Sequence, residues 1–124
     1  MRVAISAAII RNGRILLVRN ENTWTPPGGK PKEGETDLEC LSREVREELE
    51  VDLQDPSFFA VVQGETPHTG DVIEARIYLA EIVGEPRPSA EISDFAWVGR
   101  DDSGYNISEP TRLVLQILSS KGYL

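Results

Sequence analysis

Three glutamates close together in the chain could bind a divalent cation. Apolar residues around them recur at helical spacing, which places Glu44 and Glu48 one turn apart with Glu47 beside them. Like charges four residues apart destabilise a helix by roughly 0.2–0.5 kcal/mol, so the cluster needs either full solvation or a cation. Carboxylate oxygens suit Mg²⁺ or Mn²⁺, which can bridge them to substrate phosphates. The pattern therefore indicates a candidate metal and phosphate site.

A solvated helix surface would explain the same glutamates without any site. Glu39, Arg43 and Glu47 follow one another at intervals of four residues, so they could form ordinary ion pairs along an exposed face. The helix alone does not distinguish between the two interpretations. The residues that precede the helix have to distinguish between them.

The segment before the helix favours the metal site. In Gly28-Gly29-Lys30 the missing side chains would let the backbone approach an ion or a phosphate closely. Gly29 is followed by five residues, Glu35, seven residues and then Arg43-Glu44-Val45-Arg46-Glu47-Glu48-Leu49-Glu50-Val51. In this arrangement the sequence resembles the Nudix hydrolase family. Its motif is Gly, five residues, Glu, seven residues, Arg-Glu, an aliphatic residue, any residue, Glu-Glu, any residue, Gly and an aliphatic residue.

Residues 29–51 match eight of the nine specified positions of this motif. The exception is Glu50, where the family usually has glycine. Glycine beyond a helix end permits a left-handed backbone, so Glu50 is expected to shift the helix exit or to be strained, although no metal ligand is lost. The flanks also resemble the family, with an expected hairpin before Trp24 and with Glu91 six residues before Trp97.

The resemblance implies roles for the residues of the motif. Glu44, Glu47 and Glu48 would bind Mg²⁺ or Mn²⁺, with Glu44 and Glu48 as the foremost candidates and the carbonyl of Gly29 helping. Arg43 would orient the helix carboxylates by charge-assisted hydrogen bonds.

Similar enzymes use water to attack a phosphorus of a nucleoside diphosphate linked to a group X. The products are a nucleoside monophosphate and X-phosphate. Either Glu47 or Glu91 would accept the proton of that water, because family members place this role in the motif or on a later loop. Glu35 would tie the loop to the helix, and Lys30 could contact a substrate phosphate, a solvated loop lysine being the equal alternative.

The resemblance leaves the substrate and even turnover open. A nucleoside triphosphate, oxidised or not, is slightly favoured by the short chain. ADP-ribose or a nucleotide sugar is the alternative, and Pro67, sixteen residues beyond Val51, hints at it but equally suits a turn. A third alternative is a non-catalytic Nudix domain that senses a nucleotide, which would have no need to retain the three glutamates.

Other residue types that can do chemistry have simpler interpretations here. Trp24 and Tyr105 could stack on a base, but core or rim positions are more usual for such aromatics. His68 lies in a turn-forming tetrapeptide with no second His or Cys nearby, so we expect a solvent-facing residue and no transition metal. Cys40 falls among apolar residues and is expected to be a buried thiol.

The elements that position the candidate site begin with a hairpin and a loop. Val3–Ile10 and Ile15–Val18 are β-rich runs around Asn12-Gly13, a strong hairpin signal. The segment Trp24–Thr36 is rich in proline and glycine, which predicts turns with little helix or strand.

A helix follows that loop. Thr36 with Glu39 three residues later forms a capping box. The apolar stripe of this helix is expected to face away from the glutamates and consists of Leu38, Leu41, Val45 and Leu49.

Strands and a second helix make up the rest of the chain. Phe58–Gln63, Val72–Glu81 and Phe95–Val98 have strand patterns. Ser108 and Pro110 suit the start of a helix that ends before Gly122, with an inward face of Leu113, Val114, Ile117 and Leu118. Because strands separate the two helices, we expect a mixed β-sheet between helices, the α/β/α sandwich that the resemblance also implies.

Composition sets the broad class. With 124 residues, 40% hydrophobic and 27% charged, the chain is expected to fold as one domain over residues 1–124. Its 13 basic and 21 acidic residues give a net charge of -8, which disfavours nucleic acid and anionic membranes as partners. A small nucleotide would be repelled too, unless cations on the carboxylates reverse the local field.

The sequence also bears on cellular location and on assembly. No apolar run approaches the roughly 20 residues of a membrane span, and the N-terminal stretch has no signal pattern, so a cytoplasmic protein is expected. Edge strands and the terminal helix could each support a homodimer.

Overall fold

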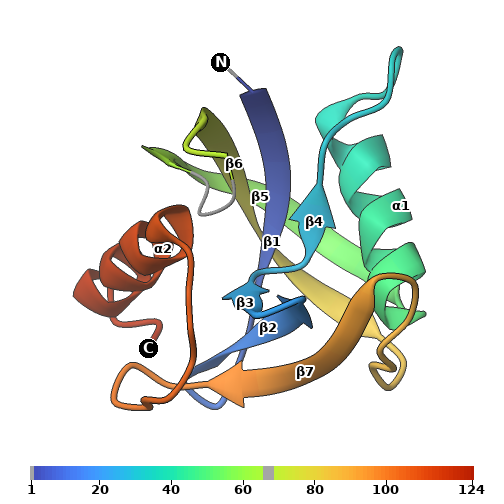
Figure 1. Ribbon diagram of the computed structural model, residues 1–124. Coiled ribbons are helices and arrows are strands. Elements are labelled where there is room, and N and C mark those ends of the chain that lie inside the picture. Colours follow the sequence, from blue (N-terminus) through green and yellow to red (C-terminus); the bar gives the residue numbers. More distant parts are fainter. Residues whose placement is uncertain (1, 66–68) are drawn as a thin grey trace.

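The computed structural model describes residues 2–65 and 69–124, and it places a mixed β-sheet between two helices, which confirms the expected sandwich (Figure 1). Helix α1 lies on one side of the sheet and α2 on the other. None of the helices in the described ranges is long and apolar enough to cross a membrane. The helices are α1 (Asp37–Leu49) and α2 (Glu109–Ser120), and the strands are β1 (Arg2–Arg11), β2 (Arg14–Asn20), β3 (Thr23–Thr25), β4 (Gly28–Gly29), β5 (Asp52–Glu65), β6 (Val72–Val83) and β7 (Ile92–Val98).

The order of the strands explains how β4 comes to lie beside α1. The main path of the sheet is β3-β2-β1-β6-β5, with β4 beside β1 and β7 beside β2. Strands β1 and β6 are parallel, whereas the other described strand pairs are antiparallel. β1 pairs with β2 only next to their turn, so the remainder of β1 pairs with β6 on one side and β4 on the other.

The predicted hairpin is confirmed between β1 and β2. Ile10 pairs with Ile15 and Arg11 with Arg14. The two residues of the turn have positive φ angles, 52° at Asn12 and 72° at Gly13, as the tight turns that suit twisted strands require.

Alternate residues of the central strands fill two separate cores. Ile5, Ala7 and Ile9 of β1 pack with the buried residues of α1, while Ala8 packs with those of α2. Cys40 belongs to the α1 core, and burial raises the pKa of its thiol to about 11, which suits the predicted structural role. The two-residue period of the strands thus lets one sheet hold both helices.

The predicted helix caps are confirmed. In α1 the Thr36 hydroxyl accepts from the Glu39 N–H at 3.2 Å, and the Glu39 carboxylate accepts from the Thr36 N–H at 2.9 Å. In α2 the Ser108 hydroxyl accepts from the Thr111 N–H at 3.3 Å. These local bonds fix where each helix begins.

Some expectations about the elements were wrong. β5 starts at Asp52 rather than near Phe58. Asp55 takes a positive φ and the register shifts between Gln54 and Ser57, which breaks the strand pattern in the sequence, but β5 pairs with β6 on both sides of this irregularity. The proline and glycine loop contains the short strands β3 and β4, since β1 and β2 offer edges to pair with.

The buried face of α1 also differs from the predicted stripe. Leu38 is 42% exposed, whereas Glu48 is only 5% exposed and lies on the inner side of the helix. Helical periodicity tells which residues share a face, but the extent of the sheet beneath the helix decides which of them are covered.

The backbone conformation of Glu50, at the C-terminal end of α1, leads to a prediction about stability. Glu50 has φ 56° and ψ 37°, a left-handed conformation, and its N–H donates to the Arg46 carbonyl at 3.0 Å. A residue with a side chain pays roughly 1–2 kcal/mol for this conformation, whereas glycine does not. Glu50→Gly is therefore expected to raise the free energy of unfolding in urea by about 1 kcal/mol. Glu50→Ala is the matched control, and equal stability of the two variants would contradict the strain.

Candidate active site

Strand β4 is a pair of glycines wedged between β1 and α1. A Cβ atom on Gly28 would lie 2.0 Å from the carbonyl oxygen of Ile5, and a Cβ atom on Gly29 would lie 2.5 Å from the carboxyl carbon of Glu44. A side chain at position 28 would therefore clash with backbone, whereas one at position 29 would displace the Glu44 carboxylate. The absence of side chains lets β4 lie against the carboxylate of Glu44. The predicted close approach of this backbone to an ion or a phosphate stays a prediction.

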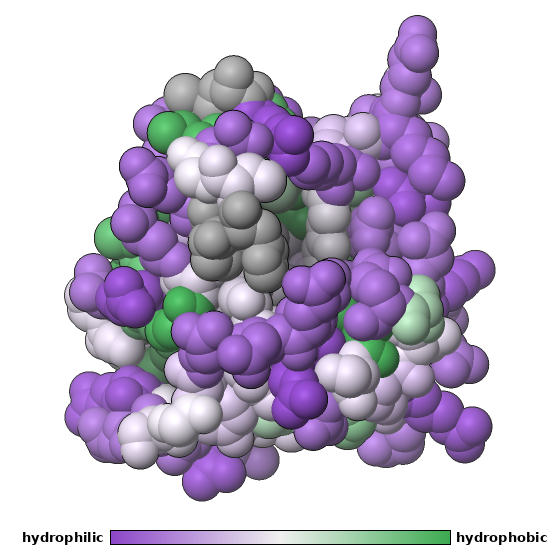
Figure 2. Space-filling view, viewed as in Figure 1, coloured by the Kyte–Doolittle hydropathy of each residue, from purple (hydrophilic) through white to green (hydrophobic). Residues whose placement is uncertain are grey.

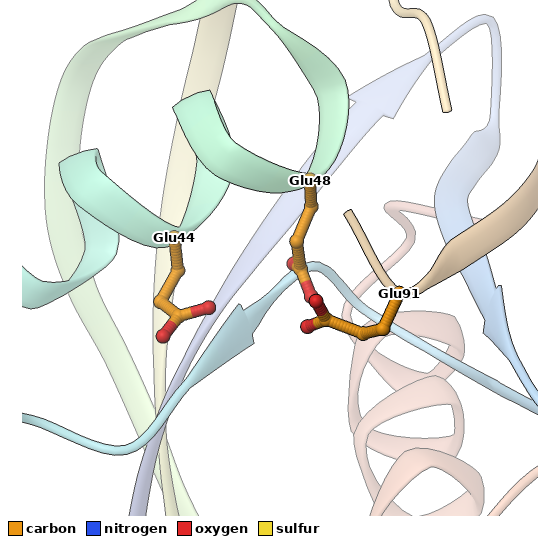
Figure 3. A group of neighbouring side chains, drawn as sticks. All are labelled: Glu44, Glu48 and Glu91. Atoms are coloured by element: carbon orange, nitrogen blue, oxygen red, sulfur yellow. The ribbon is translucent and has the colours of Figure 1, made fainter. Parts of the chain in front are cut away.

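Three carboxylates meet beside β4. Glu44 and Glu48 project from successive turns of α1 toward Glu91, which comes just before β7 (Figure 3). One oxygen of each lies within 4.8 Å of the others. The Glu48 carboxylate also accepts a hydrogen bond from the Gly28 N–H at 2.9 Å, which ties the cluster to β4.

The electrostatics of this cluster favour the uptake of positive charge, either a proton or a cation. Burial raises the pKa of Glu48 to about 8, and the neighbouring carboxylates of Glu44 and Glu91 add to that effect, while the Gly28 N–H opposes it. The pKa of Glu44 is also raised, mainly by burial. Because every donor is a carboxylate oxygen, a hard divalent cation such as Mg²⁺ or Mn²⁺ fits the group.

Arg43 holds the loop and the helix together. Its guanidinium donates two hydrogen bonds to Glu35, at 2.6 and 2.9 Å, and a third to the carbonyl of Lys30 at 3.3 Å. It also donates to Glu44 at 2.9 Å and to Glu47 at 3.3 Å. The Arg43 guanidinium holds the pKa of Glu35 down to about 2, so this ion pair persists over the working pH range.

Glu47 and Lys30 lie outside the carboxylate cluster. The side chain of Glu47 is 48% exposed and turns to Arg43 rather than to Glu48 and Glu91. Lys30 is exposed on the loop before α1. Their roles as metal ligand and phosphate contact remain predictions.

Glu91 reaches the cluster because its loop is bonded to the end of α1. The Ser89 N–H donates to the Glu48 carbonyl, and the Arg87 N–H donates to the Leu49 carbonyl, both at 2.9 Å. These bonds satisfy carbonyls that a helix C-terminus leaves without partners. The sequence pointed to Glu91 only through its distance from Trp97, and no local signal could have placed it beside Glu48.

An apolar cleft continues from the other side of β4. It has a volume of about 150 Å³, and it shares Gly28 and Gly29 with the carboxylate site. Figure 2 shows hydrophobic residues at the bottom of a hollow in a largely hydrophilic face. A cleft of this kind, apolar with few polar groups, is typical of ligand sites. Its lining comes mostly from β1, β6 and α2 and includes Ala4, Ser6, Ile73, Ala75, Ile77, Pro110, Thr111 and Val114.

The two aromatic residues considered for base stacking are not among the described residues that line this cleft. Trp24 and Tyr105 pack edge to face with ring centroids 5.1 Å apart, next to the α2 core. Pro67 and His68 lie outside the described residues.

Comparison with known proteins identifies the family. A family model described as the NUDIX domain matches residues 1–114. The chain belongs to the Nudix family. A Mycobacterium tuberculosis relative named "Putative 8-oxo-dGTP diphosphatase 2" is 28% identical to this Nudix chain over 117 residues, covering 81% of the chain and 82% of the relative.

Solved structures agree with this assignment. A MutT Nudix hydrolase from Burkholderia pseudomallei has a TM-score of 0.83 and 32% identity, covering 93% of this chain and 95% of that one. A UDP-X diphosphatase has a TM-score of 0.81 with 21% identity, covering 99% of this chain and 64% of that one, and so shares the fold. The chain is a MutT-like Nudix pyrophosphohydrolase.

The raised pKa of Glu48 predicts how the stability of the metal-free Nudix protein depends on pH. The folded protein keeps the Glu48 proton up to about pH 8, whereas the unfolded chain releases it near 4.5. Since the folded state binds more protons between these values, its free energy of unfolding should fall by a few kcal/mol as pH rises through that window. Urea unfolding in EDTA measures this, and Glu48→Gln should lose most of the dependence. A wild-type curve as flat as that variant's would contradict the buried carboxylate.

Proposed function

We propose that this protein hydrolyses a nucleoside triphosphate to a nucleoside monophosphate and pyrophosphate, with Mg²⁺ or Mn²⁺ as cofactor. The observation that carries the proposal is the position of the Glu44, Glu48 and Glu91 carboxylates next to an apolar cleft. Gly28 and Gly29 contact both. The nucleobase of the substrate enters the cleft, and the substrate phosphates lie along β4 and reach the carboxylates.

The residues around β4 divide the work of binding. Glu44 and Glu48 would hold the divalent cation, with help from the Gly29 carbonyl, and the bound cation would supply positive charge to neutralise the phosphate oxygens. Glu48 also fixes the Gly28 backbone between cleft and cluster. Arg43 orients Glu44 and keeps the loop bearing Gly29 and Lys30 against the helix.

We assign the proton acceptor to Glu91 rather than Glu47. The oxygens of Glu47 accept hydrogen bonds from Arg43, at 3.3 and 3.4 Å, which leaves fewer lone pairs for a water molecule. Glu91 lies in the cluster, within reach of a water attacking a phosphate held there. Its carboxylate takes the proton of that water as the new oxygen–phosphorus bond forms, while the phosphoanhydride bond between the α- and β-phosphates breaks to give the nucleoside monophosphate and pyrophosphate.

Glutamine variants separate the two candidates. Glu91→Gln is expected to lower kcat by about 10²–10⁴-fold with little change in KM, because the variant lacks the carboxylate that accepts the proton of the attacking water. Glu47→Gln is expected to lower kcat by less than about tenfold, since Arg43 retains Glu35 and Glu44 as partners. Steady-state kinetics at saturating Mg²⁺ measures both. A larger loss of kcat in Glu47→Gln than in Glu91→Gln would identify Glu47 as the proton acceptor.

Relatives and chemistry favour the triphosphate over the alternatives. The relatives named as a MutT Nudix hydrolase and as a putative 8-oxo-dGTP diphosphatase match 93% and 81% of the chain, at 32% and 28% identity. The UDP-X diphosphatase, at 21%, supports only the fold. With a net charge of -8, binding of a triphosphate requires cations at the carboxylates.

A product assay tests the proposal. Purified protein is incubated with nucleoside triphosphates, ADP-ribose, dinucleoside polyphosphates and nucleotide sugars in Mg²⁺ or Mn²⁺, with Glu48→Gln as the control for contaminating activity. Release of pyrophosphate and a nucleoside monophosphate supports the proposal. Release of AMP and ribose 5-phosphate from ADP-ribose, with no product from the other compounds, would make ADP-ribose the substrate in place of a nucleoside triphosphate. Nucleotide binding without turnover of any compound would make the protein a sensor.

A further inference from the structure

We propose that the cleft beside β4 selects a single-ring base, so that pyrimidine nucleoside triphosphates are the preferred substrates. This inference rests on the proposed function, because it names the base that enters the same cleft. It also separates this protein from the relative named for a purine, 8-oxo-dGTP. The size, rigidity and polar groups of the cleft each support it.

The size of the cleft matches one six-membered ring. Its volume is about 150 Å³. An engineered cavity of about that volume in another protein binds benzene. Ile73, Ile77 and Val114 line the cleft and limit the space into which a second, fused ring would extend. A pyrimidine ring fits within this volume, whereas the second ring of a purine would either extend out of the open side of the cleft, away from the apolar walls, or require the walls to move.

The walls are held by the core and the backbone. Ile77 is 1% exposed and Val114 is 2% exposed, and both belong to the core beneath α2. On the opposite side β4 is held by its antiparallel pairing with β1, Gly28 with Ser6 and Gly29 with Ile5, and by the hydrogen bond from the Gly28 N–H to Glu48. Because packed interiors resist such displacements, widening the cleft for a purine costs binding energy.

The polar groups of the cleft suit the edge of a pyrimidine. They are hydroxyls, those of Ser6, Thr25, Ser108 and Thr111, and the described lining contains no charged or amide side chain. The Ser108 and Thr111 hydroxyl oxygens lie 2.7 Å apart, and Thr111 is 2% exposed. A hydroxyl both donates and accepts, so it can pair with the carbonyl or the amino group at C4 of either pyrimidine. The two adjacent N–H donors of guanine would call for a carboxylate, which the described lining lacks.

Kinetics and binding together test the base preference. The ratio kcat/KM is measured for dCTP, dTTP, dATP, dGTP and 8-oxo-dGTP in Mg²⁺, and the dissociation constants of CMP, UMP, AMP and GMP are measured by calorimetry. We expect pyrimidines to be favoured by about tenfold or more in both, the discrimination that a small change of fit in an apolar pocket provides.

The outcomes distinguish this inference from the proposed function. Triphosphate hydrolysis with equal or higher kcat/KM for purines would overturn the base preference and leave the function standing. Absence of triphosphate hydrolysis would overturn the function, while the monophosphate affinities would still decide the base preference. Equal affinities for CMP and GMP would overturn it.

A cleft variant provides the second measurement. Ile73→Ala removes a half-buried wall of the cleft and is expected to raise purine relative to pyrimidine kcat/KM by about tenfold. Ile10→Ala is the matched control, because Ile10 packs against the same core from β1 without lining the cleft. Thermal unfolding of both variants checks the fold. An unchanged base ratio in a folded Ile73→Ala protein would overturn the inference.

Discussion

Replacing Glu48 by glutamine is expected to lower kcat by roughly 10²–10³-fold or more and to leave the fold intact. The amide oxygen of glutamine can still accept the hydrogen bond that the Gly28 N–H donates to Glu48 at 2.9 Å. What the variant lacks is the negative charge of a buried carboxylate that the cluster needs to hold a cation. Steady-state kinetics, Mn²⁺ affinity and circular dichroism measure the three properties.

The control for that variant is Glu81→Gln. Glu81 is an exposed residue of β6, so this variant loses the same charge away from the site. It should keep wild-type kcat and Mn²⁺ affinity. Full turnover in Glu48→Gln would remove Glu48 from the metal site. In metal-free buffer above pH 8, Glu48→Gln should also be more stable than the wild type, because it no longer buries a charge.

Replacing each of the adjacent glycines of β4 by alanine is expected to impair a different property, kcat in one variant and stability in the other. Gly29→Ala should lower kcat by about 10²-fold, because its Cβ would displace the Glu44 carboxylate, whose carboxyl carbon lies 2.5 Å from that position. A carboxylate at the end of a side chain can move aside, so the fold should persist. Gly28→Ala should destabilise the protein by several kcal/mol, because its Cβ would lie 2.0 Å from the Ile5 carbonyl oxygen, which is backbone.

Urea unfolding and kcat distinguish these two effects. Gly34→Ala, in the loop between β4 and α1, is the matched control, since no atom lies within 4 Å of its Cβ position. Its positive φ of 83° should cost only about 1 kcal/mol, and its kcat should be unchanged. Wild-type kcat in Gly29→Ala would show that the position of Glu44 is not critical.

Much of the fold could be predicted because its signals are local. The Asn12-Gly13 turn, the capping box of Thr36 and Glu39, and the Ser108 cap each depend on residues within a few positions of one another. The elements that were misjudged depend on partners instead. β5 continues through an irregular register because β6 pairs with it, and β4 exists because β1 provides an edge.

The candidate site also has one part that local sequence signals predicted and another that depends on contacts between distant segments. By itself the sequence determined that Glu44 and Glu48 share a helix face and that the glycines of β4 precede it, because both depend on spacing along one short segment. Only the tertiary structure decided that Glu48 is buried and that Glu91, rather than Glu47, joins the cluster. The physical reason is that side-chain neighbours are set by packing between distant segments. Hydrogen bonds from the loop before β7 to the end of α1 bring Glu91 to a residue 43 positions earlier, and no spacing along the chain encodes that contact.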